Sequence, residues 1–188
     1  MDVQANITAR RVECKKSEDP QRDACYAWER DLALPDDPPA AIPVRNPFTT
    51  ADWADEFRAF HEQTWRWGFE RFGGGHILVT ASPPYLRYSY RLRSAAAHAG
   101  LRCDPKGKLR PIITFGQRGP TRKLLLHEQA HLLTFTGRGF RANGDGHGPR
   151  FCAIALALYE QFFAVSRTAA LVIACAHGLA VAEAVVET

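Results

Sequence analysis

The stretch LLLHEQAHLL, residues Leu124–Leu133, decides how the rest of this chain is interpreted. It places His127 and His131 four residues apart in a leucine-rich run, and Gly119-Pro120-Thr121 before it predicts the start of a helix. Side chains at i and i+4 project from the same helix face, so both imidazoles can reach one metal ion. Glu128 follows the first histidine and can accept a proton from water beside that metal. The stretch therefore predicts a metal-binding helix with a general base.

A catalytic zinc site needs a third protein ligand and an open position. The metzincin continuation HxxGxxH is absent, and the best candidate is His147, which ends a glycine-rich loop over 136–149. The glycines allow the chain to reverse direction, and the apolar helix that follows would hold His147 in place. Asp145 is the runner-up ligand, and a solvated loop histidine is the alternative for His147.

Composition limits the class of protein. The chain has 188 residues, of which 46% are hydrophobic and 23% charged, as in an ordinary globular domain. A net charge of +4 without a long basic run predicts only weak, salt-sensitive DNA binding. The five cysteines include no CxxC pair, which argues against a zinc ribbon or a disulfide framework. The first residues lack an apolar signal segment and 168–182 is too short to span a membrane, so we expect a cytoplasmic protein with no membrane partner.

The order of patterns is helices, then strands, then helices, which predicts an α+β fold with a small, mostly antiparallel sheet. We expect residues 1–18 to be a disordered tail and 19–188 to be a single domain; the oligomeric state stays open. Asp19-Pro20 is expected to cap the first helix, and 94–100 to form a helical turn. Expected helices cover about 19–34, 51–72, 121–135, 151–165 and 166–177, and expected strands cover 76–80, 85–93, 111–115 and a short segment ending near 182.

Other residues support weaker hypotheses. His61 is expected on an exposed helix face, because Trp65 follows where a second ligand would be needed. His98 and His177 are isolated in the sequence and are expected to be structural. Arg150 and Tyr159 are guesses for a residue that stabilises an oxyanion.

HEQAH on a helix, then a loop, then HGPRF before an apolar helix, is similar to the SprT-like zincin arrangement. The QRDACYAWE segment and the closing HG resemble more closely a family of small actinobacterial and phage metallohydrolases. The resemblance covers about residues 20–180 and is strongest over 120–151. It implies a zincin-like fold, with the HExxH helix packed on the sheet, zinc ligands His127, His131 and His147, and Glu128 as general base. SprT-like relatives are often DNA-associated proteases with a C-terminal zinc ribbon. This chain lacks the paired cysteines that such a ribbon needs.

Together these observations predict a zinc-dependent hydrolase, with Zn²⁺ as cofactor and a protein or peptide as substrate, hence a metallopeptidase. The alternative is a non-catalytic or DNA-associated SprT-like binding module with a structural metal site. Glu128 favours the enzyme, because a purely structural site has no use for a general base.

Overall fold

The leucine-rich run around HEQAH forms the central helix of the molecule. In the computed structural model, which describes residues 19, 21–35, 51–73, 80–89, 92, 97–103, 109–117, 119–134 and 146–183, this is helix α3 (Arg122–Thr134). The Leu124 amide donates to Thr121 Oγ1 at 3.1 Å, so Thr121 caps the helix as its sequence predicts. The leucines at 125, 126, 132 and 133 are fully buried, and α3 therefore lies inside the core.

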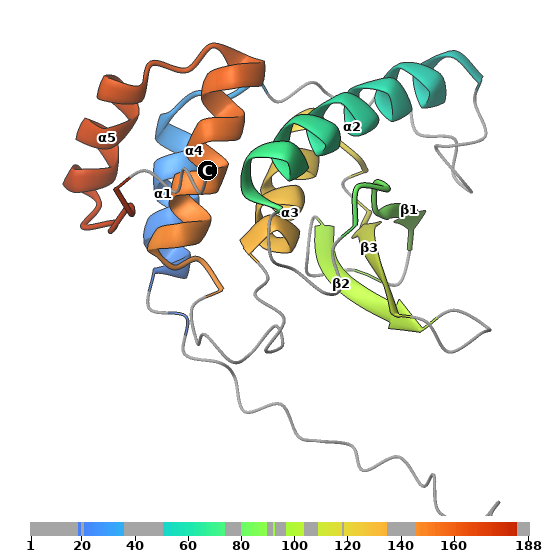
Figure 1. Cartoon of the computed structure of the whole chain (residues 1–188). Coiled ribbons are helices and arrows are strands. Elements are labelled where there is room, and N and C mark those ends of the chain that lie inside the picture. The colour runs from blue at the N-terminus through green and yellow to red at the C-terminus, as the bar shows by residue number, and fades with distance from the viewer. Residues whose placement is uncertain are drawn as a thin grey trace, which may run out of the picture.

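The elements around α3 follow the predicted order (Figure 1). Helices α2 and α4 and strands β2 and β3 all contact α3, whereas α1 contacts α5. The described elements besides α3 are α1 (Arg22–Asp31), α2 (Ala51–Phe72), β1 (Tyr85–Tyr88), β2 (Ala97–Cys103), β3 (Leu109–Phe115), α4 (Pro149–Phe163) and α5 (Arg167–Ala176).

The sheet has three strands in the described residues, in the order β1-β3-β2. Strand β3 pairs with β2 in antiparallel register, with Ala99 opposite Ile113, and with β1 in parallel register, with Tyr85 opposite Ile112. The fold class α+β is confirmed, but the expectation of a mostly antiparallel sheet is wrong, because one of the two pairings is parallel. The buried side of the sheet presents Ile113 and Phe115 to the helices.

Two local expectations are also wrong. Asp19 does not cap α1 with its side chain; Gln21 is at the cap position, and the Asp19 carboxylate contacts His147 instead. Within 94–100, the described residues from Ala97 onward belong to strand β2, because pairing with β3 overrides the helical preference of alanine. Residues 1–18 and 76–79 lie outside the described residues.

Helix α1 packs on α5 through a buried side chain. The indole of Trp28 is fully buried and its Nε1 donates to the Ala170 carbonyl at 2.9 Å. At the ends of these helices, His177 Nε2 lies 2.7 Å from an Asp31 oxygen, so His177 has the structural role expected for it. Both contacts fix α1 in place, and with it the buried face of α1 that carries Glu29.

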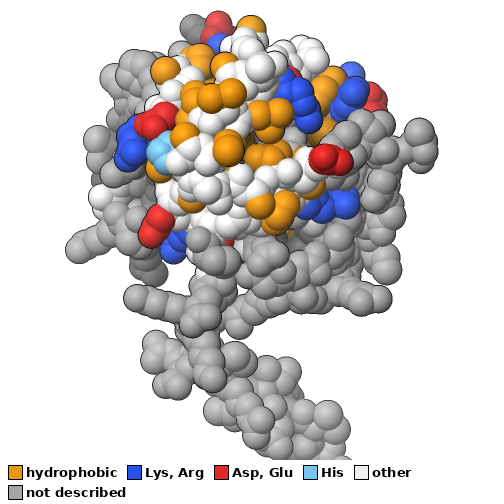
Figure 2. All heavy atoms as spheres, turned by 90° about the vertical axis from the view of Figure 1, so that its left-hand side faces the viewer, with side chains coloured by type: hydrophobic (Ala, Val, Ile, Leu, Met, Phe, Trp, Pro, Cys, Tyr) orange, Lys and Arg blue, Asp and Glu red, His pale blue; other side chains and the backbone are white. Residues whose placement is uncertain are grey.

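Helix α5 is only half buried, contrary to the expectation of a buried helix followed by a strand. Its buried side chains are Ala170 and Ala174, while Leu171 and Val172 are exposed. Figure 2, seen from the side on which α5 lies, shows hydrophobic side chains spread over this face. The described residues after α5, up to 183, form no strand. None of the described helices has the length and apolar character required to cross a membrane.

Candidate metal centre

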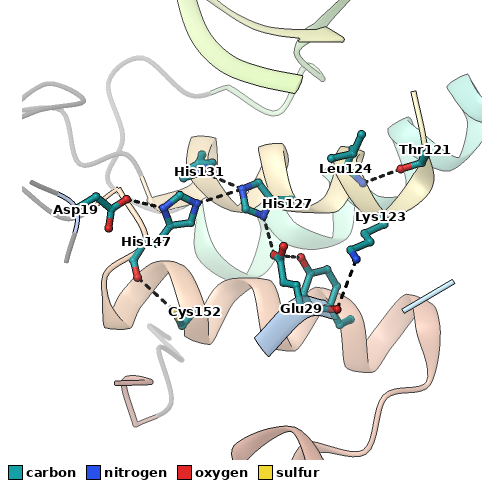
Figure 3. A network of polar contacts seen from close by, with 10 residues as sticks. Asp19, Glu29, Thr121, Lys123, Leu124, His127, His131, His147 and Cys152 are labelled. Carbon is teal, nitrogen blue, oxygen red and sulfur yellow. Dashed lines mark hydrogen bonds and ion pairs between the residues drawn. The ribbon is translucent and has the colours of Figure 1, made fainter. Parts of the chain in front are cut away.

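Two elements bring three imidazoles together. Helix α3 supplies His127 and His131 from one face, and His147 comes from the turn that precedes α4 (Figure 3). Their candidate ligand atoms all lie within 4.8 Å of one another. Gly148 and Pro149 then start α4 directly after His147, with Pro149 in the first turn, as proline prefers. The three histidines that the sequence singles out thus share one site, while Asp145 lies outside the described residues.

The nitrogen spacing fits a tetrahedral cation. His127 Nε2 lies 3.2 Å from His131 Nε2 and 3.3 Å from His147 Nε2. Zinc–imidazole bonds of about 2.0–2.1 Å at tetrahedral angles place ligand nitrogens about 3.3 Å apart. Two of the three separations therefore match those around one tetrahedral ion, and all candidate ligand atoms lie within 4.8 Å of one another.

A carboxylate hydrogen-bonds Nδ1 of His127, the first candidate ligand. His127 Nδ1 lies 2.7 Å from Glu29 Oε1 on α1, and the Tyr159 hydroxyl donates to the same oxygen at 2.6 Å. An ionised carboxylate only accepts, so Nδ1 of His127 donates to Glu29, and Nε2 of His127 points to the cluster. The Lys123 ammonium, 3.5 Å from the Glu29 carbonyl oxygen, adds a positive charge beside this pair.

A second carboxylate hydrogen-bonds Nδ1 of His147, the third candidate ligand. His147 Nδ1 lies 2.5 Å from Asp19 Oδ2, which assigns the proton of His147 to Nδ1 by the same argument. His131 is oriented by a hydrogen bond with the backbone of Gly146. The Nε2 atoms of His127 and His147 thus face each other 3.3 Å apart, an arrangement that either a shared proton or a bound cation can stabilise. Such carboxylate–histidine pairs raise ligand basicity and orient the rings in metal sites.

Burial and charge set the protonation of the cluster. Burial lowers the pKa of His131 well below its usual range, and the charges of His127 and His147 act in the same direction. Burial also lowers the pKa of His147, with His127 adding to the effect. Burial acts in the same direction on His127, but the Glu29 carboxylate outweighs it and raises the pKa of His127. His131 and His147 are therefore neutral imidazoles at neutral pH, which is the state that binds metal.

Glu128 lies beside the cluster without joining it. Its residue has an exposed fraction of only 6%, and its side chain hydrogen-bonds the backbone of Ala99 on β2. Burial is the main cause that raises the pKa of Glu128. A carboxyl group with a raised pKa, next to a candidate metal site, is suited to accept and return a proton near neutral pH.

Sequence reasoning missed Asp19 and Glu29 as partners of the ligands. Glu29 did carry a signal, because Cys25, Trp28 and Glu29 follow the i, i+3, i+4 spacing of the buried face of α1. A carboxylate on an apolar helix face needs a buried partner, and here that partner is His127. Asp19 offered no comparable signal, since Asp before a helix is common as a cap.

His61, expected on an exposed helix face, is instead buried against α3. Its Nε2 lies 2.9 Å from the Pro84 carbonyl oxygen, and its Nδ1 lies 2.8 Å from Nε2 of Gln129, the central residue of HEQAH. Gln129 therefore ties α3 to α2 on the side of the helix away from the metal cluster. Tyr159 is also fully buried and bound to Glu29, so the guess that it contacts an oxyanion is wrong.

Removal of the Glu29 charge is expected to weaken zinc binding by roughly 10- to 100-fold while leaving the fold intact. In Glu29→Gln the amide oxygen can still accept from His127 Nδ1, but the neutral group no longer raises the basicity of the imidazole. A competition titration with a chromophoric chelator measures the dissociation constant. Glu62→Gln, at an exposed position of α2, is the matched control; equal zinc affinity in Glu29→Gln and wild type would show that the carboxylate does not support the ligand.

Comparisons of the chain with models of protein families, with curated proteins and with solved structures found no match. The resemblance to SprT-like zincins and to the small metallohydrolases thus stays a prediction. The role of the metal centre is therefore inferred from its residues and their geometry.

Proposed function

We propose that this protein is a zinc-dependent hydrolase, most simply a metallopeptidase with a zincin-like arrangement of helix and sheet. The observation that carries the proposal is the convergence of three Nε2 atoms, two of them backed by carboxylates at Nδ1. Three imidazole ligands leave one position of a tetrahedral ion open, which is the ligand set of a catalytic zinc site. The packing of α3 against β2 and β3 supports the zincin-like arrangement.

The chemistry divides between the ion and the chain. Zn²⁺ bound by His127, His131 and His147 would supply Lewis acidity, which lowers the pKa of water and polarises a carbonyl group. Glu128 accepts the proton of the attacking water on its carboxylate and returns it to the leaving nitrogen. Glu29 and Asp19 hold the rings of His127 and His147 so that their Nε2 atoms keep facing the cluster.

The donor set favours zinc over other divalent ions. Imidazole nitrogens suit zinc, whereas Mg²⁺ and Ca²⁺ require several oxygen ligands. A peptide substrate is proposed because an acid–base carboxyl beside a Lewis acid suits attack on an amide. In addition, α3 lies next to strand β2, which is an edge strand among the described residues. DNA stays a weak partner in this proposal, since the net charge is only +4.

The proposal predicts metal-dependent cleavage of peptides. We expect the zinc-loaded protein to generate new termini in a mixed peptide pool, detected by mass spectrometry, and a chelator to abolish this activity. Zinc at one equivalent should restore it, whereas Mg²⁺ should not. Peptide cleavage that continues unchanged in metal-free protein would contradict a zinc-dependent mechanism. A zinc-loaded protein that cleaves nothing in the pool would instead favour the non-catalytic alternative.

A further inference from the structure

The three-histidine cluster lies between two aromatic rings that differ in exposure. The ring of Phe151, fully buried on α4, has its centroid 5.1, 4.3 and 4.8 Å from those of His127, His131 and His147. Tyr26 on α1 stacks on His127 at 5.7 Å with an interplanar angle of 17°, and meets His147 edge-on at 5.2 Å. Tyr26 is 43% exposed. Of these two rings, only Tyr26 is exposed to solvent.

The hydroxyl of Tyr26 lies among charged groups. Arg22, one helical turn earlier on α1, hydrogen-bonds the phenol, and its guanidinium carbon lies 5.7 Å from the ring centroid. Burial raises the pKa of Tyr26 and Arg22 acts to lower it, while the charges of Glu128 and Glu29 act to raise it. The Tyr26 ring thus contacts two of the three candidate ligands and pairs with Arg22.

The direction of the hydrogen bond between Arg22 and Tyr26 determines whether the phenol hydrogen is available to a substrate. A guanidinium only donates, so the Tyr26 oxygen accepts from Arg22 and its own hydrogen remains available for another acceptor. A donor that is itself polarised by a cation is a strengthened donor. Such a donor stabilises most strongly an acceptor oxygen that gains negative charge during a reaction.

We propose that Tyr26 is a catalytic residue whose hydroxyl donates a hydrogen bond to the substrate carbonyl oxygen, and that Arg22 is a positioning residue acting through Tyr26. The proposal rests on the proposed function. As water oxygen bonds to the carbonyl carbon, Glu128 takes the water proton and the carbonyl π electrons move to the oxygen bound by Tyr26. The carbonyl then re-forms, the carbon–nitrogen bond breaks, and the proton passes from Glu128 to the nitrogen. Tyr26 keeps its own proton throughout.

The substitution Tyr26→Phe tests this with little effect on packing, because the ring that stacks on His127 remains. The probe is acetohydroxamate, a small oxyanion that binds to a metal, titrated by calorimetry into zinc-loaded protein. Loss of one hydrogen bond to a charged oxygen predicts binding weaker by roughly 10- to 100-fold, with zinc affinity unchanged. Cleavage of a peptide found in the pool is expected to lose about 10²- to 10³-fold in kcat, with KM little changed. Tyr85→Phe, at a 59% exposed tyrosine on β1, is the control and should match wild type.

A double-variant comparison tests Arg22. Arg22→Gln should weaken acetohydroxamate binding less than Tyr26→Phe does, and Arg22→Lys should restore part of the loss. If Arg22 acts through Tyr26, adding Arg22→Gln to Tyr26→Phe should cause no further weakening. Additive losses would overturn the positioning role of Arg22.

The outcomes separate this proposal from the proposed function. If wild-type protein takes up no zinc, the proposed function fails and the role of Tyr26 fails with it. If the protein binds zinc but binds no acetohydroxamate, or if Tyr26→Phe binds it as tightly as wild type, the role of Tyr26 is overturned while the metal site remains.

Discussion

Glu128→Gln is expected to retain zinc and the fold but to lose about 10²- to 10⁴-fold in peptide hydrolysis. The amide has the size of the carboxylate, and its oxygen can continue to accept from the backbone of Ala99, so the buried site is not disrupted. It cannot accept a proton from water at neutral pH, so the acid–base step is lost. Burial raises the pKa of Glu128, which makes its carboxylate a better base than an exposed glutamate.

The measurement compares zinc content, thermal unfolding and the rate of peptide cleavage in Glu128→Gln and wild type. Glu62→Gln on α2 has the same chemical change at an exposed position and should behave as wild type. Cleavage by Glu128→Gln within a few-fold of wild type would show that another group is the base.

His147→Ala is expected to weaken zinc binding by several orders of magnitude, because two protein ligands are too few for a stable catalytic site. His147 Nε2 lies 3.3 Å from His127 Nε2 and its ring is oriented by Asp19, so the lost ligand is one that the fold holds ready. Asp145, the other ligand that the sequence allows, lies outside the described residues. If the three histidines are the protein ligands, Asp145→Ala should cost at most about the 10- to 100-fold typical of a group outside the ligand set.

Zinc dissociation constants of the two variants, measured against the same chelator, decide between these residues. Asp19→Asn serves as an intermediate case, since it leaves the ligand in place and removes only the charge behind it. A larger loss in Asp145→Ala than in His147→Ala would assign the third ligand to the aspartate.

Local patterns predicted most of the helices and the three histidines that the structure brings together. The capped, leucine-flanked HEQAH became α3, and the i, i+4 spacing put His127 and His131 on one face. The prediction that His147 lies near the other two histidines rested on a glycine-rich loop that allows the chain to reverse direction and on the helix that follows His147. These inferences succeed because each depends on residues near one another in the chain.

The missed features depend on contacts between distant segments. Glu29 is 98 residues from His127, and Asp19 is 128 residues from His147, so no local pattern could pair them. His61 looked solvent-exposed on its own helix, but the packing of α2 on α3 buries it against Gln129. Tyr26 belongs to a helix whose sequence shows no sign of the metal ligands it covers. Tertiary packing, and not helix propensity, determines these roles.

The metal content of the purified protein tests the central claim most directly. Elemental analysis of protein prepared without added metal, together with a zinc titration of the chelated form, should give about one zinc per chain, and binding should be abolished in the variant His127→Ala/His131→Ala. A folded wild-type protein that contains no zinc and takes up none in the titration would contradict the account.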